Sequence, residues 1–387
     1  MGSRLPSFLL LLLSLVASLA LGEIAARSFF SDSIELFPRN FAEAPYDDGV
    51  TLRRLIPSTT FRHTSIDGSW EFRTNSQGFR DDEEYRYAKP ATRLRVLVLG
   101  DSHTQGYEVG QSATFSSVLE NQLRAAGLDA EVLNTGISGF GTAEELMFLK
   151  HEGMKYRPDA VVVAFYGNDF EDNIKSGLYR LDAGQLRVQK TSHTPGVSAI
   201  RLMNAVPGAF WLSQNSYFFS LCVNTVWTIA KQMLSANARD TIEYTARISS
   251  VDAYQRNLAL ALLQEMKAVT EAAQVPLIVV DIPETASAGW TPSIPNDMMR
   301  DVAKLADAYV PASSYLAGIP DSDVHVPHGH RHISETTHKE IAGALNRVLL
   351  DLKCNATASG AQSSYQHVAH RVGHCLCRAQ CVGTAAQ

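Results

Sequence analysis

The chain of 387 residues is 45% hydrophobic and 19% charged, a composition that supports a buried core and excludes an intrinsically disordered or low-complexity protein. Its 40 Asp and Glu residues outnumber its 34 Lys and Arg residues, and no long basic run interrupts the sequence. We therefore expect no nucleic-acid partner, because binding to a phosphate backbone needs concentrated positive charge. The length allows two or three domains, and we expect one main domain with additions.

The first 22 residues form an apolar leader. Arg4 precedes an uncharged run from Leu5 to Gly22, which is the layout of a secretory signal, with small residues at the positions that define cleavage. The same run is long enough to span a bilayer as an uncleaved anchor. Both interpretations stay open, so residues 1–22 are predicted to be a signal peptide or a membrane anchor. In either case we expect an exported protein, which is periplasmic, extracellular or attached to the membrane through this segment.

Four short apolar runs, each rich in β-branched residues, predict buried strands. Three of them follow segments with a helical pattern, and this alternation is typical of a parallel sheet covered by helices on both faces. We therefore predict a three-layer α/β/α sandwich over residues 94–352, with residues 23–93 as an amino-terminal extension packed on it. The four runs are Arg95–Leu99, Val132–Asn134, Ala160–Phe165 and Pro276–Asp281.

An insertion separates the third and fourth predicted strands. It covers residues 174–245, which is too long for a plain crossover, and we predict a mostly helical cap or lid. Leu202 to Ala230 contains no charged residue and is rich in aromatic residues. A packed cap, a substrate lid and a membrane-facing surface are the three interpretations of this stretch, although its interruptions by Asn, Gln and Pro disfavour a transmembrane span.

The carboxyl-terminal tail, residues 353–387, shows no apolar periodicity and contains no acidic residue after Cys354. Three of the five cysteines lie at Cys375, Cys377 and Cys381. Their spacing with the nearby histidines matches no established zinc pattern, and an exported context favours disulfides over metal binding. We predict a disordered, cysteine-containing appendage.

Polar residues follow the predicted strands at the edge where parallel sheets bind ligands. Ser102 comes directly after the first strand and is the candidate nucleophile, and Gly139 lies in a glycine-rich turn after the second. Asn168 follows the third strand, and His332 precedes the last helical segment. A serine hydroxyl needs a positioned base and donors for an oxyanion, and these residues are of the types that supply both. Asp101 is adjacent to Ser102, and we predict that it supports the site by accepting hydrogen bonds from loop amides.

These blocks, in this order, resemble the SGNH (GDSL-type) hydrolase superfamily, in particular a bacterial exported branch, over about residues 75–352. The blocks are GDSHT with Ser102, ISGFG with Gly139, GND with Asn168 and HISETTHKEIA with His332, preceded by TNSQGFR. The resemblance implies a flavodoxin-like sandwich without a cofactor. It also implies that Ser102 attacks an acyl carbonyl and that His332 transfers its proton. The oxyanion donors would be the backbone N–H groups of Ser102 and Gly139 and the side-chain amide of Asn168.

The His block departs from the family pattern. Family members carry an Asp two or three residues before the catalytic His, where this chain has His330 and Gly329. Asp323 and Asp321 are the candidate orienting carboxylates in the same loop. A backbone carbonyl, leaving a Ser–His dyad, is the alternative. Five histidines lie within residues 325–338, but we predict no metal site because few acidic ligands accompany them.

Three functions remain open at this point. The first is an exported serine esterase that removes a small O-acyl group such as O-acetyl, with an acylated polysaccharide or a lipid as substrate. The second is an O-acyltransferase that acts on an envelope or extracellular polysaccharide through the same acyl-enzyme. The third is an inactive protein of this fold that binds glycans or an assembly partner, and it is motivated by the missing Asp.

Overall fold

Five parallel strands build the central sheet, in the spatial order β14-β11-β7-β5-β6. This computed structural model describes residues 4–246, 251–287, 289–328 and 331–358. The strand order is that of a flavodoxin-like sheet, which places the topological switch point between β5 and β7. The α/β prediction is confirmed, but β14 was missed because it is only partly buried and forms no β-branched apolar run. The strands are β5 (Leu94–Gly100), β6 (Ala130–Asn134), β7 (Ala160–Phe165), β11 (Leu277–Asp281) and β14 (Ala308–Val310).

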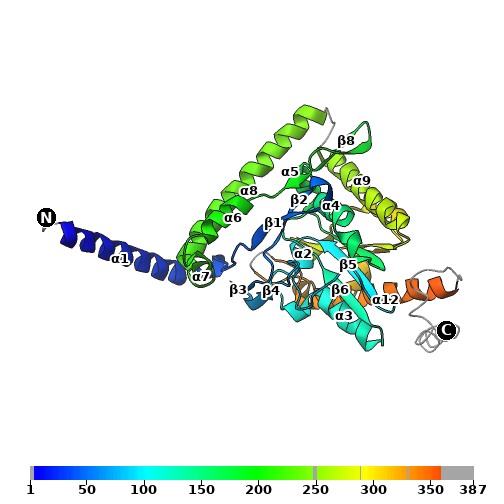
Figure 1. The fold of residues 1–387 in the computed structure, drawn as a ribbon, viewed down its shortest axis with the longest axis horizontal. Helices are drawn as coiled ribbons and strands as arrows, with labels where there is room; N and C mark the ends of the chain where they lie inside the picture. Colours follow the sequence, from blue (N-terminus) through cyan, green and yellow to red (C-terminus); the bar gives the residue numbers. More distant parts are fainter. Residues whose placement is uncertain (1–3, 247–250, 288, 329–330, 359–387) are drawn as a thin grey trace.

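Helices cover both faces of this sheet. Alternate residues of β5 enter two separate cores: Leu97 and Leu99 face one, and Val96 and Val98 face the other, as the two-residue period of a strand requires. Figure 1 shows α4 and α9 on one side of the sheet and α3 and α12 on the other. The three-layer sandwich is therefore confirmed. The helices of these layers are α3 (Phe115–Ala125), α4 (Thr142–His151), α5 (Asp169–Ser176), α9 (Val251–Ala272), α10 (Asn296–Leu305), α11 (Ala312–Tyr315) and α12 (Glu335–Ala358).

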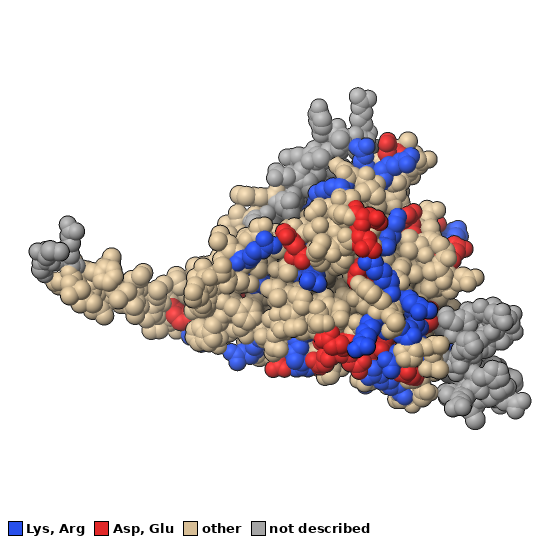
Figure 2. Space-filling model, in the orientation of Figure 1, with Lys and Arg blue, Asp and Glu red and all other residues tan. Residues whose placement is uncertain are grey.

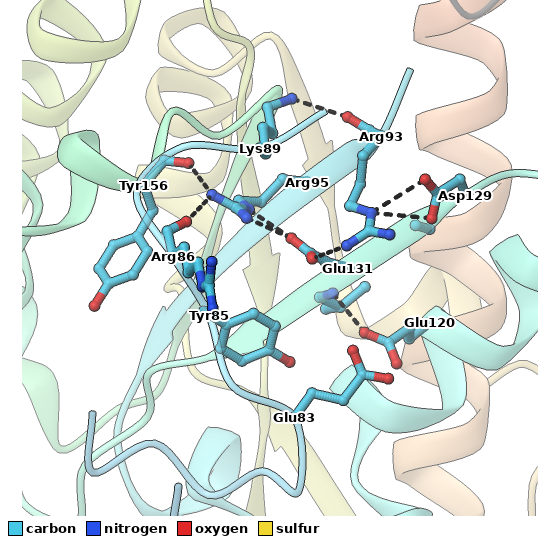
Figure 3. Close-up of polar contacts among 12 residues, drawn as sticks. Glu83, Tyr85, Arg86, Lys89, Arg93, Arg95, Glu120, Asp129, Glu131 and Tyr156 are labelled. Atoms are coloured by element: carbon cyan, nitrogen blue, oxygen red, sulfur yellow. Dashed lines mark hydrogen bonds and ion pairs between the residues drawn. The ribbon is translucent and has the colours of Figure 1, made fainter. Parts of the chain in front are cut away.

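A buried ion-pair cluster closes the amino end of β5 and β6. Arg95 is 1% exposed, and its Nε donates to Glu131 Oε2 at 2.7 Å. Arg93 donates to Glu131 Oε1 at 2.5 Å and to Asp129 at 3.0 Å. Figure 3 shows these side chains together with the Tyr156 carbonyl, which accepts from Arg95 Nη1 at 2.5 Å. Each buried charge thus has an opposite charge beside it, which is the condition for burying ions without a large penalty.

The amino-terminal extension packs against the sandwich as two small β-structures. β1 pairs with β2 in antiparallel fashion, and β3 pairs with β4 as a hairpin. A short strand of the insertion, β10, joins β2 in parallel and links the extension to the insertion. The elements are β1 (Phe41–Pro45), β2 (Thr51–Leu55), β3 (Thr60–Ser65), β4 (Gly68–Arg73) and β10 (Ser192–His193).

The leader forms a single helix, α1 (Arg4–Phe30), which continues past residue 22 without a break. It is long and apolar enough to cross a membrane, with a mean hydropathy of 2.3 in its most apolar window. Figure 1 shows α1 extending away from the body, and Figure 2 shows its described surface without charge until it meets the body. Glu23 there accepts hydrogen bonds from the backbone N–H groups of Tyr217 and Phe218 at 3.1 and 3.0 Å. The last turns of α1 are therefore joined to the first turn of α8.

The insertion is mostly helical, as predicted, and it also contains short strands. After the end of α5 the chain forms a β-hairpin, then β10, and then three helices. The longest helix, α8, packs along the base of α1 and contributes Trp227, whose ring lies 5.2 Å from the Arg39 guanidinium. The elements are β8 (Tyr179–Asp182), β9 (Gln185–Val188), α6 (Val197–Asn204), α7 (Ala209–Asn215) and α8 (Tyr217–Ala246).

The last helix extends further than its apolar pattern indicated. α12 continues to Ala358, whereas we placed the domain end at residue 352. No proline or glycine stands between these positions to end the helix, so α12 continues beyond the residues that pack on the core. The remaining tail, residues 359–387, lies outside the described residues, so its predicted disorder stays a prediction.

Candidate functional site

Ser102 lies at the first turn of a short helix, α2 (Ser102–Gln105), directly after β5. Asp101 caps this helix, because its side chain accepts from the His103 N–H at 2.8 Å. Gly100 permits the sharp turn: a Cβ there would lie 2.0 Å from Thr104 Oγ1. The turn therefore presents Ser102 at the carboxyl edge of the sheet, beside the switch point between β5 and β7.

His332 lies within hydrogen-bond distance of Ser102. Its Nε2 is 2.9 Å from Ser102 Oγ, and both residues are 9% exposed. The rings of Tyr107 and His103 lie against the imidazole, each with a centroid separation of 4.7 Å. This packing restricts the ring, so the hydroxyl and the imidazole are held in the geometry required for proton transfer.

The carboxylate beside His332 belongs to Glu108, whose Oε2 is 3.3 Å from His332 Nδ1. Glu108 is 2% exposed and has a φ of +63° in the loop after α2. Glu108 was not among the residues predicted from the sequence. One feature of the sequence could have identified it. Glu108 is an acidic residue six positions after the candidate nucleophile, and it stands between Tyr107 and Val109, two residues of types that are often buried.

The expectation that Asp321 or Asp323 orients His332 is wrong. Both lie in an exposed 3₁₀ turn. The two arms of the loop pair with each other, since the Val326 N–H donates to the His332 carbonyl at 2.9 Å and the Ser334 N–H to the Val324 carbonyl at 3.0 Å. This register carries Asp321 and Asp323 past Ser334, away from the imidazole.

Asn168 follows β7 and faces Asp101. Its Nδ2 donates to Asp101 Oδ2 at 3.1 Å, while Asp101 Oδ2 is also 3.5 Å from Ser102 Oγ. An amide nitrogen carries two hydrogens, so this bond leaves one for a second acceptor. The Asp101 carboxylate thus holds both the helix turn beneath Ser102 and the amide of Asn168.

Gly139 lies in the turn after β6, where residues 137–140 form a β-turn closed by the Phe140 N–H bonding to the Ile137 carbonyl at 2.9 Å. Its φ of +78° is the left-handed value that a type II turn requires at this position. The Ser138 N–H donates to Gln105 Oε1 at 2.5 Å, which ties the turn to α2. On its other side, Arg53 Nη2 donates to the Ser138 carbonyl oxygen.

Burial dominates the electrostatics of this edge. It raises the pKa of Asp101 to about 6, although hydrogen bonds from the His103 N–H and Asn168 favour its charged form. It also lowers the pKa of the His103 imidazole well below its usual value, so that ring is neutral at pH 7. The pKa of Glu144, across the cavity, rises to about 8 for the same reason, with Asp172 adding to the shift.

A cavity of about 350 Å³ opens over Ser102 and His332. The main domain supplies one side of the cavity, and the amino-terminal extension and the insertion supply the rest. A substrate lid was one of the interpretations of the insertion, whereas the contribution of the extension was not predicted. Much of the lining is polar or charged. It comprises Arg39, Phe41, Arg53, Ser102, His103, Tyr107, Ser138, Gly139, Glu144, Tyr166, Asn168, Asp172, Lys175, His193, Pro195, Trp227 and His332.

The histidines of residues 325–338 do not converge on one point. His325 Nε2 lies 3.0 Å from the Pro283 carbonyl, His338 Nδ1 accepts from the Phe115 N–H at 3.0 Å, and His328 pairs with Asp67 at 2.8 Å. His330 lies outside the described residues. Over the part of the chain that the structure describes, no three His, Cys, Asp or Glu residues are grouped as metal ligands.

Comparison with known proteins identifies the family. The model of the GDSL-like lipase/acylhydrolase family matches residues 98–341, so the chain belongs to this family of ester-acting hydrolases. A segment of 75 residues is 35% identical to an arylesterase of Vibrio mimicus; it covers 19% of this chain and 38% of that protein.

The solved structures that align with this chain include TesA and two esterases. The chain is 13% identical to TesA, with coverage of 65% of this chain and 97% of TesA at a TM-score of 0.37. It is 15% identical to the SGNH-hydrolase family esterase AlinE4, covering 70% and 98% of the two chains at a TM-score of 0.34. A two-domain esterase active on acetylated mannans is 12% identical, with 66% and 49% coverage and a TM-score of 0.36.

Proposed function

We propose that this protein is an exported serine esterase that hydrolyses a small O-acyl ester, such as an O-acetyl group, through a covalent acyl-enzyme. The observation that carries the proposal is the contact of 2.9 Å between Ser102 Oγ and His332 Nε2, with the Glu108 carboxylate 3.3 Å from the opposite ring nitrogen. The Ser102 hydroxyl therefore has His332 beside it as a base, and His332 has Glu108 as its orienting carboxylate.

In the first half of the reaction, His332 Nε2 accepts the Ser102 proton as Oγ attacks the acyl carbonyl. The carbonyl oxygen becomes an oxyanion, which is stabilised by the N–H groups of Ser102 and Gly139 and by the free hydrogen of Asn168 Nδ2. His332 then returns the proton to the departing alcohol. Water attacks the acyl-enzyme in the second half, again with His332 as base, and regenerates Ser102.

Glu108 has the role of an orienting carboxylate. Accepting the Nδ1 proton of His332 fixes the tautomer in which Nε2 is the basic nitrogen, and the negative charge stabilises the imidazolium that forms. Because a carboxylate occupies this place, the missing Asp of the His block no longer favours an inactive binding protein.

The residues that line the cavity favour an ester whose alcohol part is polar over an ester with a long lipid chain. Arg39, Arg53, Lys175, Glu144 and Asp172 line the space beside Ser102, and an alkyl chain placed there would desolvate these groups without offering hydrogen bonds in return. An acylated sugar offers hydroxyl groups to them, and Phe41 and Trp227 provide flat apolar surfaces. We therefore assign the ester to a carbohydrate, with an envelope or extracellular polysaccharide as the substrate class.

The apolar helix α1 supports the proposed export. It is 27 residues long, and its exposed part carries the only long apolar run in the described chain that is suited to a bilayer. Intact-mass measurement of the native protein distinguishes a retained anchor, which begins near Met1, from a processed form that begins near residue 23.

The test is fluorophosphonate labelling of the full-length protein in detergent micelles, followed by peptide mapping and by release of acetate from p-nitrophenyl acetate. We expect one adduct per chain on Ser102, which Ser102→Ala abolishes and the exposed control Ser314→Ala retains. The absence of an adduct on folded protein would contradict the proposal. Acetyl transfer to an added oligosaccharide in preference to water would identify the O-acyltransferase instead.

A further inference from the structure

The turn that carries Gly139 has two possible orientations of its central peptide. In residues 137–140 that peptide joins the Ser138 carbonyl to the Gly139 N–H, and the two groups point in opposite directions because the peptide is trans. Type I and type II turns differ by a rotation of this peptide, which moves φ of the third residue from about +80° to about −90°. The observed φ of +78° at Gly139 is the type II value.

A glycine at the third position makes both orientations accessible, since glycine adopts positive and negative φ with similar ease. Only one of the two orientations points the Ser138 carbonyl toward Arg53, and it directs the Gly139 N–H to the opposite side of the peptide. No hydrogen bond from this N–H to another described residue is present, so it is not held by an acceptor of its own. Some other contact has to select the type II form.

Arg53 makes that contact. Its Nη2 donates to the Ser138 carbonyl, the group that reverses direction if the peptide rotates. Its guanidinium lies against the turn closely enough that a Cβ on Gly139 would be 3.0 Å from Nη2. The other anchor of the turn, Gln105, binds the N–H of Ser138, which belongs to the preceding peptide and leaves the central one free to rotate.

The position of Arg53 itself is fixed. It lies in β2, where it pairs with Glu43 across the β1–β2 ladder, and it is 6% exposed. Its guanidinium carbon is 4.3 Å from the centroid of the Phe41 ring, a cation–π contact. Burial lowers its pKa only to about 10, so the side chain stays cationic at neutral pH.

We propose that Arg53 is a positioning residue of the oxyanion site, which holds the Ser138–Gly139 peptide in the type II orientation so that the Gly139 N–H faces the substrate oxygen. This inference rests on the proposed function for its catalytic consequence, whereas the orientation of the peptide is independent of it. Its physical basis is that a cationic donor on the carbonyl both fixes the peptide plane and polarises its N–H. The amino-terminal extension is thereby part of the catalytic apparatus.

The test compares Arg53→Met, Arg53→Lys and a matched control, Arg54→Met, in the full-length protein. Arg54 is the next residue of β2 and does not line the cavity. We expect Arg53→Met to lower kcat for p-nitrophenyl acetate by about 10- to 100-fold, somewhat less than the loss of a whole oxyanion donor. KM should change less than threefold. Arg53→Lys keeps the charge and should recover part of the loss, and Arg54→Met should stay within twofold of the wild type.

Crystal structures of the wild type and Arg53→Met give a readout that needs no activity. We expect φ of Gly139 to become negative in Arg53→Met and to remain positive in Arg54→Met. The inference is overturned if the turn keeps its orientation, or if it rotates without loss of kcat, or if the whole effect falls on KM. Should Arg53→Met fail to fold, Arg53→Gln takes its place. If the wild type hydrolyses no ester, the proposed function is contradicted. The φ of Gly139 in the two crystal structures still shows whether Arg53 fixes the orientation of the Ser138–Gly139 peptide.

Discussion

The polar side chains at the two ends of β5 differ in whether they have partners. At the amino end, Arg95 is buried against Glu131, and Arg93 completes the pairing (Figure 3). At the carboxyl end, the buried oxygens Asn168 Oδ1 and Glu108 Oε1 have no hydrogen-bond partner within the described chain. A buried polar atom without a partner is destabilising. The comparison indicates that one end of the sheet is built for stability and that the other retains polar groups for chemistry.

The buried acids extend this contrast. Burial raises the pKa of Glu145 and Asp169 well above their usual values; the charge of Glu145 adds to the shift of Asp169, and the charge of Asp101 adds to both shifts. Neither has a cation beside it in the described chain. Ionising these acids at the carboxyl end of the sheet is therefore costly. At the amino end, Glu131 forms ion pairs with two arginines, which stabilise its charge.

Ser102→Ala should reduce kcat by at least about 10⁴-fold, because nothing else at the site supplies the nucleophile. Its melting temperature should stay within a few degrees of the wild type, since the carboxyl edge contributes little to stability. Ester hydrolysis and thermal unfolding of the same preparation measure both quantities. A variant that keeps more than a tenth of the activity would remove Ser102 from the mechanism.

Glu108→Gln should lower kcat by about 10²- to 10⁴-fold, because an amide neither fixes the tautomer of His332 nor stabilises its cation. The control is Asp323→Asn, for which we expect activity within twofold of the wild type, since Asp323 is exposed and distant from the imidazole. Steady-state kinetics on an aryl ester separates the two. Equal losses in both variants would contradict the assignment of Glu108.

Arg95→Met should destabilise the fold by about 3–5 kcal/mol, because it leaves Glu131 buried with one partner fewer. The specific activity of the folded fraction should not change, since the cluster lies at the opposite end of the sheet from Ser102. Urea unfolding measures the loss. The double variant Arg95→Met/Glu131→Leu should recover much of it, and failure to recover would indicate that Arg95 acts through its bonds to backbone carbonyls instead.

Asn168→Ala should cost about 2.7–4 kcal/mol of transition-state stabilisation, that is, about 10²- to 10³-fold in kcat. KM should change little, because the oxyanion forms only after substrate binds. The pH profile should keep its shape, since no titrating group is removed. A loss confined to KM would show that Asn168 binds the substrate and does not hold the oxyanion.

Asp101→Asn should change the pH dependence of stability. The pKa of Asp101 is raised to about 6, so the folded state binds a proton more tightly than the unfolded state does. The contribution of Asp101 to wild-type stability therefore falls as pH rises from about 4 to about 7, and this loss approaches about 3 kcal/mol for a pKa that rises from 3.8 to about 6. Between pH 4 and 8, urea unfolding should show the stability of the variant rising relative to wild type. A constant difference would mean that Asp101 does not titrate in this range.

The sandwich and most of the candidate site could be predicted from local patterns of residues. Runs of β-branched residues followed by helical segments specify buried parallel strands, because only such strands are apolar on both faces. Polar residues placed directly after those strands must gather at one edge, which is why Ser102, Gly139 and Asn168 could be found from their spacing. Patterns of this kind depend only on residues that are close together in the sequence.

The side chains that complete the site are brought together by long-range packing. Glu108 and Arg53 reach their partners across 224 and 85 positions of the chain, respectively, and no periodicity links residues that far apart. Asp323 is nearer to His332 in sequence, but the pairing of its loop carries it away. A hydrogen bond depends on distances of about 3 Å between side-chain atoms, and those distances are set by the packing of the extension, the loop after α2 and the sheet together.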